Sequence, residues 1–340
     1  MIRSHTVPRF YLEQFASPRQ NKPGRVWVYG RNQEPTLRST RAQGYEKGYF
    51  GIAKTDGTLD ESLEQKLAGF EEACNDTLRL CGSRFIDLPS ASRRSKLAFY
   101  AAHLFCRATQ RRSYSNRLWM KMQKEFAEDV VNNDAYIKAA ARHYSDRFGI
   151  DVSPIEMKER LARFSDEMNT GRAVNNGFVE DLLLQTEYLA QVLLEKPWQI
   201  WRAPEGFEFI TSDNPVISFV LVGNGQLSLG YGFRRPDVTV AFPVSPNATL
   251  AMGSKGPEFV TLNETQVKRL NEAMIRLCDR FVYSKMNSDA VRELVDAHGG
   301  TARYGENAFL LAGAKQPSVR DFLEHQLGLV IEPEKERSAS

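Results

Sequence analysis

The 340-residue sequence lacks the features that mark a secreted or membrane-spanning protein. It has no apolar run of about 18 residues, the length that a transmembrane helix needs, and its N-terminus lacks the apolar core of a signal peptide. Its four cysteines form no Cys-x-x-Cys pair, so a structural zinc site is not expected. We therefore expect a cytoplasmic protein that makes no membrane contact.

A strong excess of charge is also missing. The 45 lysine and arginine residues nearly balance the 42 aspartate and glutamate residues, which leaves a formal net charge of +3. A protein that coats nucleic acid normally carries a basic stripe, so extended duplex binding is not expected. The balance favours a small anionic ligand, or a nucleic acid held locally, and it does not indicate an oligomeric state.

Several common catalytic motifs are absent. The sequence has no GxxxxGK[ST] phosphate loop, no GxGxxG between a strand and a helix, no HExxH and no GxSxG. Nucleotide-driven and serine-hydrolase chemistries of the common kinds are therefore not expected.

What the sequence does contain is a change of pattern near residue 197. Between residues 59 and 196, apolar residues recur at helical spacing and predict about five helices, over 59–80, 90–108, 116–147 with a break near Asn132, 154–168 and 175–195. After Pro197, short β-branched and aromatic runs predict strands over 198–201, 207–211, 216–222, 227–233, 238–242, 249–252 and 280–285, with helices over 263–277 and 289–298.

The N-terminal region adds a short helix over 8–16 and a strand over 25–29, and the nearest convincing partner strands lie beyond residue 197. We therefore predict an α+β fold. Its mostly antiparallel sheet is formed by the N-terminal strand and the C-terminal third, with a large inserted helical bundle. The predicted divisions are 1–58, 59–196 and 197–331, followed by a disordered tail over 332–340.

The N-terminal segment concentrates groups that are useful in chemistry. His5 could act as an acid, a base or a metal ligand, Arg9 could bind phosphate or carboxylate, and Tyr11 adds a phenol. The alternative is that His5 caps the helix while Arg9 pairs with a nearby glutamate. The residues alone leave both interpretations open.

Two helices carry charged residues at regular spacing. Glu64 and Glu71 are seven residues apart, so they share a face but lie about 10.5 Å apart along the axis, too far for one metal ion. We interpret them as surface or pairing carboxylates, either of which could lean towards Arg9. His103 and Arg107, with Arg111, form a stripe beside an apolar face, which suits a groove or a polar contact between helices.

The Ser212-Asp213-Asn214-Pro215 stretch interrupts a β run with consecutive polar groups. Such a loop at the end of a strand displays Asp213 and Asn214 where sheets often bind ligands, although it is also an ordinary turn composition. We favour a functional loop.

Taken in order, these segments resemble a bacterial family of unknown function. The resemblance is carried by His5–Phe15, Val26–Tyr29, Arg107, Phe209–Val216, Phe242–Pro246 and Arg280–Tyr283. The family opens with a His-aromatic-Val-Pro segment and later carries Ser-Asp-Asn-Pro-Val; Thr6 departs from this pattern. The resemblance implies no activity. It implies that His5, Arg9, Arg107, Asp213 and Asn214 form one constellation.

Three functional hypotheses follow. In the first, the protein is a phosphodiesterase-like or nuclease-like hydrolase of a nucleotide or nucleic acid, in a bacterial defence role. His5, Asp213 and Asn214 would be catalytic, and Arg9, Tyr11 and Arg107 would bind substrate, with a divalent metal left open as cofactor. In the second, the same residues bind an anionic small molecule or a protein partner without turnover. In the third, they are structural.

Overall fold

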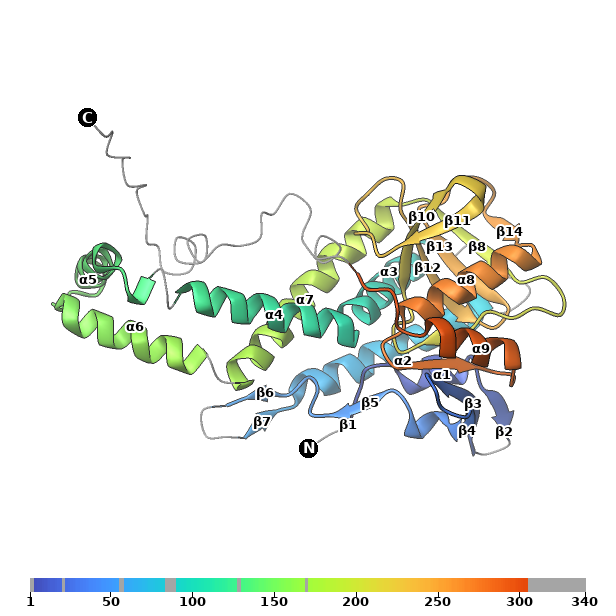
Figure 1. Cartoon of the computed structure of the whole chain (residues 1–340), viewed down its shortest axis with the longest axis horizontal. Coiled ribbons are helices and arrows are strands. Elements are labelled where there is room, and N and C mark those ends of the chain that lie inside the picture. The colour runs from blue at the N-terminus through green and yellow to red at the C-terminus, as the bar shows by residue number, and fades with distance from the viewer. Residues whose placement is uncertain are drawn as a thin grey trace. The chain divides into compact units, whose positions relative to one another are not determined.

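A computed structural model describes residues 3–19, 22–54, 58–82, 90–126, 130–168 and 171–304 (Figure 1). The chain forms two compact units, one made of Met1–Tyr114 with Val179–Leu310 and the other of Ser115–Phe178 with Leu311–Ser340. The predicted disordered tail lies outside the described residues. In the part of the chain that is described, none of the helices has the length and apolar character needed to cross a membrane.

The larger sheet of the first unit has the strand order β11-β10-β12-β13-β8-β14. Its strands are β8 (Trp198–Arg202), β10 (Ile217–Val222), β11 (Gln226–Leu229), β12 (Thr239–Ser245), β13 (Ala248–Met252) and β14 (Phe259–Thr261). Neighbours run antiparallel, except that β14 is parallel to β8. Every residue of β12 and β13 is buried, so these strands form the centre of the core.

The smaller sheet joins the two ends of the sequence. It contains β2 (Ser17–Arg19), β3 (Lys22–Gly30), β15 (Phe281–Ser284) and β9 (Thr211–Ser212), with β4 (Thr36–Ser39) on the free side of β3. β3 and β15 are antiparallel, with Val28 opposite Tyr283. The predicted pairing of the N-terminal strand with a late strand is therefore confirmed.

The prediction of one sheet was wrong in detail, because the late strands belong to two. The chain leaves the smaller sheet after Ser212 and enters the larger one at Ile217. Pro215 lies between them and has no N–H to donate, so it cannot continue a ladder. The predicted strand over 207–211 is accordingly reduced to β9.

The N-terminal region also contains elements that the sequence pattern did not predict. They are the antiparallel pairs β1 (Arg3–His5) with β5 (Tyr45–Lys47) and β6 (Ile52–Ala53) with β7 (Leu59–Asp60), and the 3-10 turn Thr40–Ala42. The predicted helix behind Pro8 is present but short, as α1 (Arg9–Glu13).

Most predicted helices are present close to their expected bounds. They are α2 (Ser62–Gly82), α3 (Ala91–Cys106), α4 (Thr109–Phe126), α5 (Asp134–Phe148), α6 (Pro154–Met168), α7 (Gly171–Glu195), α8 (Glu264–Leu277) and α9 (Asp289–His298). The predicted break near Asn132 separates α4 from α5, where the Asn133 side chain accepts the amides of Ala135 and Tyr136. The α+β class is confirmed.

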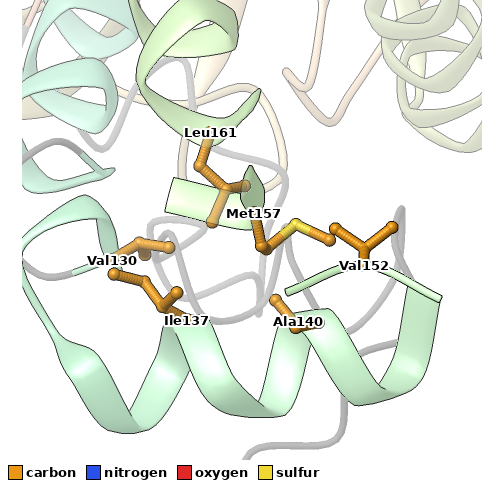
Figure 2. Close-up of a cluster of buried hydrophobic side chains, with 7 residues drawn as sticks. Val130, Ile137, Ala140, Val152, Met157 and Leu161 are labelled. Atoms are coloured by element: carbon orange, nitrogen blue, oxygen red, sulfur yellow. The ribbon is translucent and has the colours of Figure 1, made fainter. Parts of the chain in front are cut away.

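The helical insertion has a small core of its own. In the second unit, α5 and α6 pack through apolar side chains that include Val130, Ile137, Ala140, Met157 and Leu161 (Figure 2). By contrast, α2 and α3 belong to the first unit, and α2 packs on β12 and β13. The compact units thus divide at 114/115 and 178/179, inside the predicted helical bundle.

Candidate functional site

Arg107 is the most unusual charged residue of the first unit. It follows the last turn of α3, and its side chain is only 1 % exposed. One guanidinium nitrogen, Nη1, lies 2.5 Å from Oε1 of Glu71 on α2. The Tyr49 hydroxyl donates a 3.0 Å hydrogen bond to the Arg107 carbonyl, which fixes the backbone. A buried arginine with one carboxylate partner is therefore held in place from two sides.

The other edge of this guanidinium is not used. Nε and Nη2 of Arg107 are buried and have no hydrogen-bond partner among the described residues. These two N–H groups point the same way in a planar guanidinium, and such an edge matches the two oxygens of a carboxylate or a phosphate. Because burying unpaired donors costs free energy, this edge is suited to an anion or to water.

Glu64 stands on the same helix as Glu71, two turns earlier, and is half-buried. The backbone amide of His5 and the hydroxyl of Ser4 donate hydrogen bonds to it, so β1 is tied to α2. Burial raises the pKa of Glu64 above its ordinary value, while the charge of Arg107 and these hydrogen bonds act against the shift. Its Oε2 has no described partner. A carboxylate with a raised pKa beside a cation can accept or release a proton.

Neutral polar groups lie around Arg107. His103 is completely buried, and burial together with the Arg107 charge holds the pKa of His103 well below its usual value, so the ring is uncharged. Its Nδ1 lies 3.5 Å from Oγ1 of Thr186. Burial likewise raises the pKa of Tyr100, whose ring contacts that of Phe10 in the N-terminal motif. This environment concentrates the charge of the site on Arg107, Glu64 and Glu71.

His5 is linked to this cluster through its backbone amide, which donates to Glu64. Its strand partner is Tyr45, and the two rings meet edge-on at 6.3 Å. His5 is partly exposed, as are Glu64 and Glu71, whereas Arg107 is not. The cation of this cluster is therefore buried, and His5, Glu64 and Glu71 are more exposed than Arg107.

Arg9 and Tyr11, both predicted to bind substrate, make other contacts. Arg9 is exposed and pairs with Glu13 one turn later, as the alternative interpretation of the motif expected. Tyr11 is completely buried, and its hydroxyl lies 2.7 Å from both the Thr211 hydroxyl and the Pro243 carbonyl oxygen. These contacts make Tyr11 a bridge between α1 and the two sheets.

Replacing Tyr11 with phenylalanine should lower the free energy of unfolding by about 1–3 kcal/mol, because the Thr211 hydroxyl and the Pro243 carbonyl lose a buried partner. Urea unfolding measures the change. Tyr188→Phe is a matched control, since it removes only an exposed hydrogen bond to Arg234 and should cost about 0.5 kcal/mol or less. Equal stability of the two variants would contradict the bridging role.

The Asp213 carboxylate forms a clamp on the segment before β15. Its two oxygens accept the backbone amides of Asp279, Arg280 and Phe281 at 2.7–2.9 Å. Burial raises the pKa of Asp213 to about 6, although the three amides act against this shift. Both carboxylate oxygens are therefore directed at backbone, with Oδ2 accepting two of the three bonds.

Asn214 contributes to the same junction. Its Nδ2 donates to the Leu277 carbonyl at 3.0 Å, and its backbone amide donates to the Ser212 hydroxyl. The predicted constellation is thus divided. His5 and Arg107 each contact a glutamate of α2, Glu64 and Glu71 respectively, whereas Asp213 and Asn214 hold residues 277–281. Their catalytic role stays a prediction.

Sequence reasoning underestimated Glu64 and Glu71. They were predicted to be surface or pairing carboxylates that could lean towards Arg9, whereas Glu71 pairs with Arg107 and the charge of Arg107 acts on Glu64. The signal that could have identified them is charge complementarity between two predicted helices. The helix over 59–80 carries acidic residues on one face, and the helix over 90–108 carries basic residues beside its apolar face. Within the described ranges, no group of three or more His, Cys, Asp and Glu side chains is arranged to hold a metal ion.

Comparison with known proteins gives one match. A family model described as "Protein of unknown function (DUF4238)" matches residues 3–288. No curated protein and no solved structure matches the chain.

Proposed function

The chain belongs to the DUF4238 family of proteins of unknown function, and we propose that it is a hydrolase of phosphate esters or phosphodiesters in a nucleotide or nucleic acid. The observation that carries the proposal is the free Nε/Nη2 edge of Arg107 beside a carboxylate of raised pKa. An anion on that edge would replace the hydrogen bonds that the buried guanidinium lacks. The near-neutral net charge favours a single phosphate group held locally over a long duplex.

Each charged residue has a distinct role in this proposal. Arg107 binds two phosphate oxygens and stabilises the charge that grows on them in the transition state. Glu71 keeps the guanidinium oriented through Nη1. Glu64 takes a proton from the attacking water, whose oxygen forms the new bond to phosphorus.

The leaving group needs a proton when its bond to phosphorus breaks. His5 is the candidate donor, because its backbone is anchored to Glu64 and its side chain is partly exposed. A histidine side chain can donate a proton and be reprotonated by solvent after each cycle. Asp213 and Asn214 then act as positioning residues that fix the sheet junction.

Arg107→Lys tests the anion site, because lysine keeps the charge but lacks the planar fork. The assay compares hydrolysis of a panel of nucleotides and single-stranded RNA and DNA oligonucleotides by wild type and variant. We expect kcat/KM to fall about 10- to 100-fold, the loss of a charge-assisted bidentate contact. Arg93→Lys, an exposed change on the same helix, should leave the rate unchanged.

Two results would count against hydrolysis. If Arg107→Lys and wild type turned over every active substrate equally, Arg107 would not bind the reacting phosphate. If wild type bound a panel member through Arg107 but released it unchanged, the non-catalytic binding module would replace the hydrolase.

A further inference from the structure

A large pocket of about 1190 Å³ lies in the first unit, among residues unrelated to the Arg107 cluster. Its walls come from the chain after β8, from α8, from the segment that links β15 to α9, and from α9 itself. We call it the α8–α9 pocket. Its volume is somewhat above the range of about 300–1,000 Å³ that is usual for small-ligand sites.

The pocket carries positive charge from three separate elements. Arg202 ends β8, Lys268 lies on α8, and Lys285 follows β15. Two carboxylates also line it, and one of them, Glu208, lies 3.6 Å from Lys285. The lining cations outnumber the lining carboxylates by one, but Lys268 also pairs with Glu264 on α8, so a bound anion would take the place of a carboxylate partner at each lysine.

An apolar wall faces the same space. Phe207, Val291 and Leu294 are partly exposed and line the pocket. The Nζ of Lys268 lies 5.8 Å from the centre of the Phe207 ring, so a charged group and an aromatic surface are adjacent. A ligand that fills this space needs both an anionic group and an apolar body.

The wall is held in shape without a ligand. Asn271 on α8 accepts the Ile210 amide at 3.1 Å and donates to the Glu208 carbonyl at 2.8 Å. The Phe209 amide donates to the Pro246 carbonyl at 2.7 Å. These bonds fix residues 207–210, and a preformed wall reduces the entropy lost on binding.

We propose that the α8–α9 pocket binds a small organic anion whose carboxylate or phosphate is met by Lys268 and Lys285 and whose apolar or aromatic body lies on Phe207, Val291 and Leu294. The site shares no residue with the Arg107 cluster. It would therefore hold a second ligand or a regulatory molecule, whatever the Arg107 site does.

The test uses 8-anilinonaphthalene-1-sulfonate, an aromatic anion that fluoresces when it leaves water. Ala290 is exposed and lines the pocket, so Ala290→Trp places a bulky ring beside the apolar wall without disturbing the core. We expect Ala290→Trp, and separately Lys268→Gln/Lys285→Gln, to raise the Kd of the probe about tenfold or more. Glu293→Trp, an exposed change on α9, and Lys121→Gln/Lys158→Gln are the matched controls and should bind as wild type does.

Competition then distinguishes the two anionic groups. Displacement by adenosine monophosphate identifies a phosphate ligand, and displacement by laurate identifies a carboxylate. Displacement by neither would mean binding of an adventitious additive only and would overturn the proposal. So would a Kd for Ala290→Trp equal to that of wild type. Arg107→Lys should leave probe binding unchanged, which separates this proposal from the proposed hydrolase.

Discussion

Asp213→Ala is expected to lower the free energy of unfolding by about 3 kcal/mol or more. The substitution leaves three backbone amides, those of Asp279, Arg280 and Phe281, without their acceptor at a buried junction. Urea unfolding followed by circular dichroism measures the loss. The affected segment leads into β15, which pairs with β3, so both ends of the chain depend on this clamp.

Asp213→Asn separates shape from charge. The amide keeps one acceptor but turns an N–H₂ group towards backbone donors, so it should cost less than alanine and still destabilise the fold. Stability equal to wild type in both variants would contradict the clamp.

The clamp also predicts a pH dependence. Burial raises the pKa of Asp213 from its ordinary 3.8 to about 6, so between these values the folded state holds a proton that the unfolded state has released. The stability that comes from the raised pKa of Asp213 is therefore fully present below pH about 4 and is lost as the pH rises through about 6. Asp213→Asn should lack this component, and unfolding curves at pH 4 and pH 7 would show the difference.

Local signals explain which elements could be predicted. Helix α6 begins at Pro154, and its start is capped by reciprocal hydrogen bonds between Ser153 and Glu156. These residues are close in the sequence, so the start of the helix can be predicted from it. Helix α8 likewise starts with a capping box of Asn263 and Gln266. Both helices have the expected bounds, because capping depends on residues three or four apart.

Pairings over long distances could not be predicted in the same way. β1 meets β5 across about forty residues, and neither strand has the alternating pattern that identifies a half-buried strand. The consecutive polar residues of the Asp213 loop predicted a functional loop. The partners of Asp213 are backbone amides at 279–281, which no side-chain pattern reveals. The strand patterns paired the N-terminal strand with a late strand correctly, but they predicted one sheet where the late strands belong to two.

The site shows the same limit. The stripe beside an apolar face suited Arg107 to a polar contact between helices, and the structure buries it there. Its partner depends on how two helices pack, so Glu71 was predicted only as a surface or pairing carboxylate that could lean towards Arg9. Charge complementarity between helices becomes visible only when their relative rotation is known.

Glu64→Gln is the second variant for which a large effect is expected. The amide keeps the shape of the side chain but cannot take a proton from water, so kcat/KM for phosphate-ester hydrolysis should fall by about 100-fold or more. Glu72→Gln, an exposed change on the same helix, is the control and should retain the wild-type rate. Both proteins should unfold at similar temperatures.

The most direct test of the account is the pH profile of this hydrolysis in wild type and in Glu64→Gln. Because Glu64 must be ionised to act as a base and burial raises its pKa, the wild-type rate should fall as the pH drops through a value above the ordinary 4.5 of a glutamate. In Glu64→Gln the rate should be low and this acidic limb should be absent. A variant that keeps the wild-type rate and the same acidic limb would contradict the assignment of Glu64 as the base.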